Sequence, residues 1–175
     1  MQTGGYTQNP VNECYRDVAT VATAKELGCL ENWCNNSQMH EYSVALRISG
    51  AKLDPTEVTA RLHLTPTQVR IAGQPRQGGK SSWDESMWDY EVRPEGKTAW
   101  SSLEEGLKTL LSAFLSLNEA LEHYKRSFHV FLWCGHFSSS FDGGPTFSSA
   151  LLKQLGDFGV ELYLDTYFSE ESKPR

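Results

Sequence analysis

The sequence predicts an α+β fold in which helices pack on one face of a mainly antiparallel sheet. Three observations predict this class. Short segments with alternating apolar and polar residues recur along the chain, as expected for strands that bury one face. Segments with apolar residues at helical spacing lie between them, and they begin at residues that can cap a helix. With 175 residues, of which 39% are hydrophobic and 22% are charged, the chain suits a single core.

The first strand and the first helix have the clearest local signals. Residues 42–49, YSVALRIS, predict a strand because apolar and polar side chains alternate along them. In the following LDPTEV, Asp54 can cap a helix, Pro55 suits its first turn and Glu57 has the spacing of a capping box. We expect this helix to end before Pro66, because the residue before a proline is pushed out of helical geometry.

A glycine-rich stretch separates the next two strands, which residues 67–73 and 87–92 predict. Within it, QPRQGGKS differs from the phosphate-binding loop pattern only at its first position, which is Gln74 instead of glycine. A phosphate-binding loop needs a helix that starts at its lysine, and no helical apolar repeat follows Lys80. We therefore interpret the stretch as a hairpin connection that does not bind nucleotide.

The longest helix should begin near Ser101 or Ser102, with leucines at helical spacing and an interruption at Asn118. Residues 127–134, SFHVFLWC, then predict a central strand, because both of its faces have large side chains. We expect a polar loop over residues 135–146.

The chain closes with a helix and a strand. The helix should run from a cap near Ser148 to Gly159. Residues 160–168, VELYLDTYF, alternate and predict a last strand whose outer face is polar and aromatic.

This order of elements resembles a split βαβ unit, the ferredoxin-like arrangement, with an extra helix and strand appended. We expect a two-layer sandwich with a sheet of about five strands and helices on one face. The domain should span residues 39–170. Residues 1–38 would be a loosely ordered or partly helical extension, and residues 171–175 a disordered tail. An exposed aromatic strip on the uncovered face would serve as an interface or a ligand platform.

The charge of the chain restricts the classes of partner. A net charge of −6 and a pI near 5.4 argue against nucleic acid, because phosphate neutralisation needs clustered lysine and arginine. No stretch approaches the length of a membrane span, and the first residues lack the pattern of a secretory signal. We therefore expect a cytoplasmic protein that does not associate with membranes.

Four residues near the start of the chain are candidate zinc ligands: Cys14, Cys29, Cys34 and His40. The pattern lacks the closely spaced cysteine pair of most structural zinc sites, so we favour an extension without metal. We expect no cofactor.

The stretches YSVALRISGAKLDPTEVTARLHLTPTQV, W-x2-LEEGL and GVELYLDTYF together resemble the bacterial domain-of-unknown-function family numbered 4279, over about residues 42–168. The resemblance implies the fold, but it implies no enzyme activity and no cofactor. It also implies a setting in which such proteins are sometimes encoded beside polymorphic toxins, where an acidic inhibitor would fit. Residues 1–38 fall outside the resemblance.

The best candidates for acid–base or metal chemistry are His129, His136, Asp142 and Asp165, with Tyr163 nearby in the sequence. Their spacing matches no known motif. A histidine in a sheet strand is more often partly buried, and an aspartate before two glycines is more often a turn residue. Cys134 is expected to be a small buried apolar residue.

We favour binding over catalysis. The leading hypothesis is a non-catalytic binding domain, an immunity-type inhibitor of a basic toxin, whose binding residues are Trp133, Tyr163, Asp165 and Tyr167. Two alternatives stay open. One is a small metal-dependent or acid–base hydrolase that uses the histidines and aspartates, and the other is an oligomerisation module that forms a homodimer through the last strand.

Overall fold

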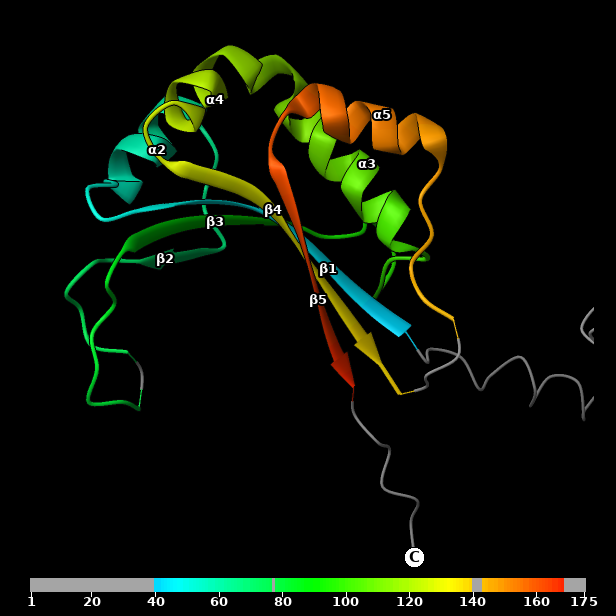
Figure 1. Ribbon diagram of the computed structural model, residues 1–175, viewed down its shortest axis with the longest axis horizontal. Helices are drawn as coiled ribbons and strands as arrows, with labels where there is room; N and C mark the ends of the chain where they lie inside the picture. The colour runs from blue at the N-terminus through cyan, green and yellow to red at the C-terminus, as the bar shows by residue number, and fades with distance from the viewer. Residues whose placement is uncertain (1–39, 77, 140–142, 169–175) are drawn as a thin grey trace, which may run out of the picture. The chain divides into compact units, whose positions relative to one another are not determined.

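The computed structural model describes residues 40–76, 78–139 and 143–168 (Figure 1). The proposed extension, with Cys14, Cys29 and Cys34, lies outside these residues, as does the proposed tail. Asp142 lies outside them too. The strands are β1 (His40–Gly50), β2 (Gln68–Arg70), β3 (Ser86–Val92), β4 (His129–Ser138) and β5 (Glu161–Phe168). The helices are α2 (Pro55–Leu62), α3 (Leu103–Phe114), α4 (Asn118–Lys125) and α5 (Ser149–Phe158), with a 3₁₀ turn, η2 (Leu115–Leu117), between α3 and α4.

The strands form one sheet in the order β2-β3-β1-β4-β5. β1 lies in the middle and pairs antiparallel with β3 and β4, and β2 pairs antiparallel with β3. β5 alone runs parallel to its neighbour, β4, and α5 provides the crossover that a parallel pair requires. The first four strands thus have the ferredoxin-like order, and the appended helix and strand extend the sheet. The predicted α+β class is confirmed.

The helices lie on one face of this sheet, and the opposite face of the sheet is bare of helices (Figure 1). Between the two layers, apolar side chains from β1, β4 and the leucine stripe of α3 form the core. Trp88 of β3 is fully buried there, and its indole N–H donates a hydrogen bond to Thr59 Oγ1 of α2 at 3.1 Å. Within the described ranges, every helix is too short or too polar to cross a membrane.

The predicted helix starts are confirmed at three serine or aspartate caps. The side chains of Asp54, Ser102 and Ser148 accept hydrogen bonds from the backbone N–H groups of the first turns of α2, α3 and α5. At the other end of α5, Gly159 adopts a left-handed conformation with φ of 70°, which closes the helix as its sequence position predicts.

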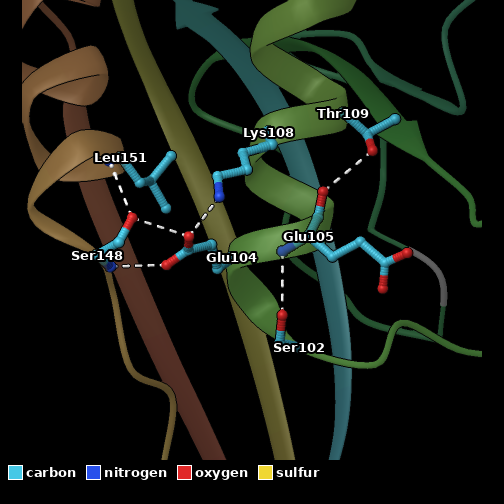
Figure 2. A network of polar contacts seen from close by, with 7 residues as sticks. All are labelled: Ser102, Glu104, Glu105, Lys108, Thr109, Ser148 and Leu151. Atoms are coloured by element: carbon cyan, nitrogen blue, oxygen red, sulfur yellow. Dashed lines mark hydrogen bonds and ion pairs between the residues drawn. The ribbon is translucent and has the colours of Figure 1, made fainter.

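The carboxylate of Glu104, in the first turn of α3, contacts the cap of α5 and so joins the starts of the two helices (Figure 2). Glu104 accepts one hydrogen bond from the Ser148 backbone N–H at 2.7 Å and another from Ser148 Oγ at 2.9 Å. Lys108, one turn further along α3, forms an ion pair with the same carboxylate. The hydrogen bond from Lys108, followed by those from Ser148, lowers the pKa of Glu104 to about 2.

Two predicted boundaries are wrong. β2 spans only Gln68–Arg70, whereas residues 67–73 were expected to form a strand. β4 continues to Ser138, whereas a loop was expected from Gly135. The reason for the second error is pairing: β1 begins at His40, so residues 135–138 have strand partners on β1 and on β5. Backbone hydrogen bonds on both sides of the strand override its polar composition.

The glycine-rich stretch forms a hairpin connection, as predicted. Gly73 donates its N–H to the Trp83 carbonyl at 2.8 Å, and Pro75 forms an antiparallel bridge with Ser82. Lys80 lies in the turn between these pairs and does not begin a helix.

Candidate functional site

Alternation along the strands divides the side chains between a helix-covered face and a face that the helices leave bare. On β1, Val44, Leu46 and Ile48 are fully buried under the helices, whereas Arg47 points to the bare side. The register aligns Arg47 with Asp89 on β3 and with Phe131 on β4. We call this bare side the open face, and its central residues are Arg47, Asp89, Phe131, Trp133, Phe137, Tyr163, Asp165 and Tyr167.

A chain of polar and aromatic contacts crosses four strands of the open face. Arg47 Nε lies 2.6 Å from Asp89 Oδ2, and the guanidinium carbon of Arg47 lies 4.1 Å from the centroid of the Trp133 ring. The indole N–H of Trp133 then donates to Asp165 Oδ2 at 2.5 Å. A cation–π contact on one side and a hydrogen bond on the other fix the orientation of the indole. Trp133 is therefore held in place before any partner binds.

The other aromatic rings of the open face also pack against one another. Phe131 lies 4.8 Å from Tyr163 between ring centroids, and Phe137 stacks on Tyr167 at 4.9 Å. Ring pairs at such distances contribute about 0.5–1.5 kcal/mol beyond the area they bury. Even so, Phe137, Tyr163 and Tyr167 remain 38%, 42% and 47% exposed. The face thus presents rings that are ordered but still partly exposed to water.

Gly135 leaves room for two of these rings. A Cβ atom at this position would lie 2.7 Å from Cη2 of Trp133 and 3.0 Å from Cε2 of Phe137. Both neighbours are parts of rigid rings, so any side chain at position 135 would force Trp133 and Phe137 to move. Glycine therefore allows the two rings to lie over the strand between them.

Carboxylates lie on both halves of the open face, with Glu41 and Glu91 on β1 and β3 and two more on β5. The carboxylates of Glu161 and Asp165 lie on exposed β5, whereas Arg47 is neutralised by Asp89. Hydrogen bonds from His129 and then from Tyr163 lower the pKa of Glu161, so this group is ionised near neutral pH. The half of the open face formed by β4 and β5 is therefore both aromatic and acidic.

Basic groups gather at the opposite end of the sheet. Trp83, in the hairpin between β2 and β3, has the guanidinium carbon of Arg70 4.3 Å from its ring centroid and that of Arg76 at 4.5 Å. Burial, and then the nearby positive charge of Arg47, lowers the pKa of Arg70.

The four residues predicted for binding lie together on the acidic, aromatic half. Trp133 is on β4, and Tyr163, Asp165 and Tyr167 follow one another on the same face of β5. The register places Trp133 beside Tyr163, and Asp165 is joined to Trp133 by its hydrogen bond.

The residues predicted for acid–base chemistry do not converge. His136 lies on the helix-covered face and is only 4% exposed, whereas His129 lies on the open face and contacts Glu161 at 3.2 Å. Asp165 of β5 pairs with Gly135 of β4. Gly135 lies six residues from His129 on β4, so Asp165 and His129 are separated by about 20 Å along the strands. Because side chains alternate between the two faces, residues that are close in the sequence are separated by the sheet.

Sequence reasoning missed the contact that His136 makes. His40 Nδ1 and His136 Nε2 lie 2.9 Å apart, and the ring of Tyr42 stacks on His136 at 5.3 Å. Burial, and then the charge of His40, lowers the pKa of His136. The sequence pattern groups His40 only with the early cysteines, as a candidate zinc ligand. Within the described ranges no group of three or more potential metal ligands occurs.

Cys134 is a buried core residue, as predicted. Burial raises the pKa of its thiol to about 12, so the group is neutral at physiological pH.

Sequence reasoning also missed Arg47, Asp89 and Phe137 as parts of the open face. The alternation of residues 42–49 places Arg47 on the uncovered side of its strand, which was a usable signal. The contacts of Arg47 with Asp89 and Trp133 depend on the register of three strands, which the sequence does not display.

A comparison of the sequence with protein-family models matches residues 40–169 to the family described as Domain of unknown function (DUF4279). Comparisons with curated proteins and with solved structures find no match. The matched residues include all five strands of the described sheet.

Proposed function

Because the chain belongs to the DUF4279 family, whose description gives no activity, we propose its function from the open face: the domain binds another protein through the β4–β5 half of that face. The partner presents basic side chains together with apolar ones. We further propose that this binding makes the domain an immunity-type inhibitor that covers a basic surface of a toxin.

The observation that supports the proposal best is the ordered aromatic surface around Trp133. Aromatic anchors with neighbours that already fix their rotamers bind with a small loss of conformational entropy. Trp133 is held between Arg47 and Asp165, and the rings of Phe137 and Tyr167 are stacked. Tryptophan and tyrosine are also the residues that contribute most to protein interfaces.

The charge of the surface defines the partner's chemistry. Glu161 and Asp165 lie among the rings of the β4–β5 half, and the whole chain has a net charge of −6. Both features attract a partner with exposed lysine or arginine and accelerate its association. A basic toxin surface, which must be covered quickly to protect the cell, would have this chemistry.

Binding is favoured over hydrolysis because of the placement of the polar groups. Catalysis by the histidines and aspartates requires them to meet around one substrate. His136 and His129 instead lie on opposite faces of the sheet, and each has a partner of its own.

A selection from a random peptide display library tests the proposal. The wild-type chain should enrich peptides that combine lysine or arginine with an apolar anchor. Trp133→Ala with Asp165→Lys should weaken the binding of an enriched peptide at least about tenfold, because the anchor and the attracting charge are lost. The matched control is Trp83→Ala with Asp157→Lys, which makes the same chemical changes elsewhere, and its affinity should stay within about twofold of wild type.

The same variants test the inhibitor role in cells. These cells express a gene that lies next to the gene of this protein and that encodes a product that arrests growth. Wild type and control should restore growth, and the open-face variant should not. Equal affinity of the two double variants for the enriched peptide, or equal growth with both, would contradict the assignment of the surface.

A further inference from the structure

β5 is an edge strand whose side chains are exposed on both faces of the sheet. It ends the strand order, and all eight of its residues are exposed. Of the ten large exposed hydrophobic side chains in the described ranges, five belong to β5: Leu162, Tyr163, Leu164, Tyr167 and Phe168. Leu162 and Leu164, on the side of the helices, are still 37% and 41% exposed. The helix layer therefore does not cover the edge of the sheet.

The edge lacks the features that usually prevent strand pairing. Natural edge strands are kept apart by prolines, lysines, bulges or a very short length. β5 contains no proline and no lysine, and its eight residues pair with β4 in a regular register from Glu161 to Phe168. Only Glu161 and Asp165 place charge on it.

We propose that two copies of the chain pair antiparallel through their β5 edges, about a two-fold axis at Leu164. The proposal goes beyond the binding function and does not rest on it. A two-fold axis perpendicular to the sheet makes the interface isologous, so that each residue faces its counterpart according to one fixed register. It also keeps both helix layers on the same side and joins the two open faces.

The two carboxylates select this register. With the axis at Tyr163, Glu161 would face the partner's Asp165, and with the axis at Asp165, the two copies of that residue would face each other. Like charges directly opposite each other destabilise a strand pair. With the axis at Leu164, every carboxylate has a tyrosine opposite it. Asp165 then faces the partner's Tyr163, and Glu161 faces the partner's Tyr167.

The length of β5 favours the same register. An axis at Leu164 pairs residues 161–167 of each copy, which is nearly the whole strand. On the side of the helices, Leu164 then faces its own copy and Leu162 faces the partner's Thr166. An axis at Thr166 would also avoid like charges, but it would pair only residues 164–168 and leave Leu162 exposed.

A second copy is therefore a better occupant than an unrelated strand. A foreign segment would have to bring suitable hydroxyl or basic groups opposite Glu161 and Asp165, whereas the strand itself provides tyrosine hydroxyls at Tyr167 and Tyr163 when it meets its own copy. The partner's leucine at position 164 also covers the same apolar position on the first copy.

Sedimentation equilibrium of the full chain from micromolar to millimolar concentration tests the proposal. Wild type should show a reversible monomer–dimer equilibrium. Leu164→Lys and Leu164→Glu should each raise the dimer dissociation constant at least about tenfold, because two like charges meet at the axis. Leu152→Lys, which puts the same charge on an exposed leucine of α5, should change it less than about threefold. Circular dichroism confirms that each variant is folded.

Mixing the two position-164 variants tests the register itself. Because residue 164 faces only its own copy when the axis lies there, the lysine and glutamate chains should form a heterodimer that neither chain forms with itself. The proposal is overturned by a wild-type chain that stays monomeric throughout, even if it accepts a foreign peptide strand. It is equally overturned by a Leu164→Lys chain that dimerises as well as Leu152→Lys, or by a mixture that associates no better than its components.

Discussion

At the scale of single residues, Glu104 shows how one carboxylate joins two helices that are far apart in the sequence. It accepts two hydrogen bonds from Ser148, at the cap of α5, and forms an ion pair with Lys108 on its own helix (Figure 2). All these contacts favour the ionised carboxylate, so the pKa of Glu104 is lowered to about 2.

Glu104 should therefore contribute to the acid sensitivity of the fold. The pKa of this carboxyl is about 2 in the folded chain, below its ordinary value of 4.5. At acidic pH the folded chain therefore binds fewer protons at this group than the unfolded chain does. Its stabilising effect is present above pH about 4.5 and is lost as the pH falls towards about 2. Urea unfolding at a series of pH values measures this effect. Glu104→Gln should lower the free energy of unfolding at neutral pH, and this free energy should then fall less between pH about 4.5 and about 2 than it does in wild type.

The control for this experiment is Asp157→Asn, which removes an exposed carboxylate from α5. The loss of stability at neutral pH should be larger in Glu104→Gln than in this control, because Glu104 also joins the start of α5 to α3. If Glu104→Gln has the same acid profile as wild type, the contacts with Ser148 do not stabilise the ionised form.

At the scale of elements, local sequence signals and their order predicted the ferredoxin-like arrangement of helices and strands, but not the register in which the strands pair. The caps at Asp54, Ser102 and Ser148 were visible because a cap is formed by neighbouring residues. The extension of β4 to Ser138 was not, because it depends on pairing with residues more than 90 positions earlier in the chain. For the same reason, alternation placed the residues predicted for binding on one face of β4 and β5, whereas the contact of Trp133 with Arg47 could not be predicted.

Two helical glycines show the same distinction between local and tertiary effects. A Cβ at Gly106 of α3 would lie 2.7 Å from Cγ2 of Val44 on β1, whereas a Cβ at Gly156 of α5 would have nothing within 4 Å. The first glycine lets α3 approach the sheet closely. The second has no such neighbour and only reduces helix propensity.

Substitution of each glycine by alanine should therefore have opposite effects on stability. Gly156→Ala should raise the free energy of unfolding by about 0.5–1 kcal/mol, the difference in helix propensity. In Gly106→Ala the overpacking cost of about 1–3 kcal/mol should exceed that gain and lower the stability. Urea denaturation measures both. Two alanine variants of equal stability would show that α3 does not pack on Val44 as closely as described.

At the scale of the whole molecule, the described residues form a sheet with two different faces. Helices cover one face (Figure 1). The other face combines aromatic rings with the carboxylates of β5. The chain also has a net charge of −6. An ordered aromatic surface in an acidic protein suits the basic protein partner that we propose, and this partner should contact the surface around Trp133.

Nuclear magnetic resonance of the tryptophan side chains tests whether the partner contacts Trp133. The five tryptophans each give an indole N–H signal, and single substitutions assign them. When a basic peptide from the display selection is added, the signal of Trp133 should shift most, because its N–H bonds to Asp165 on the proposed surface. The signal of Trp88, fully buried under the helices, should stay in place. Binding that leaves the Trp133 signal unchanged, or that shifts Trp88 or Trp83 instead, would contradict the account.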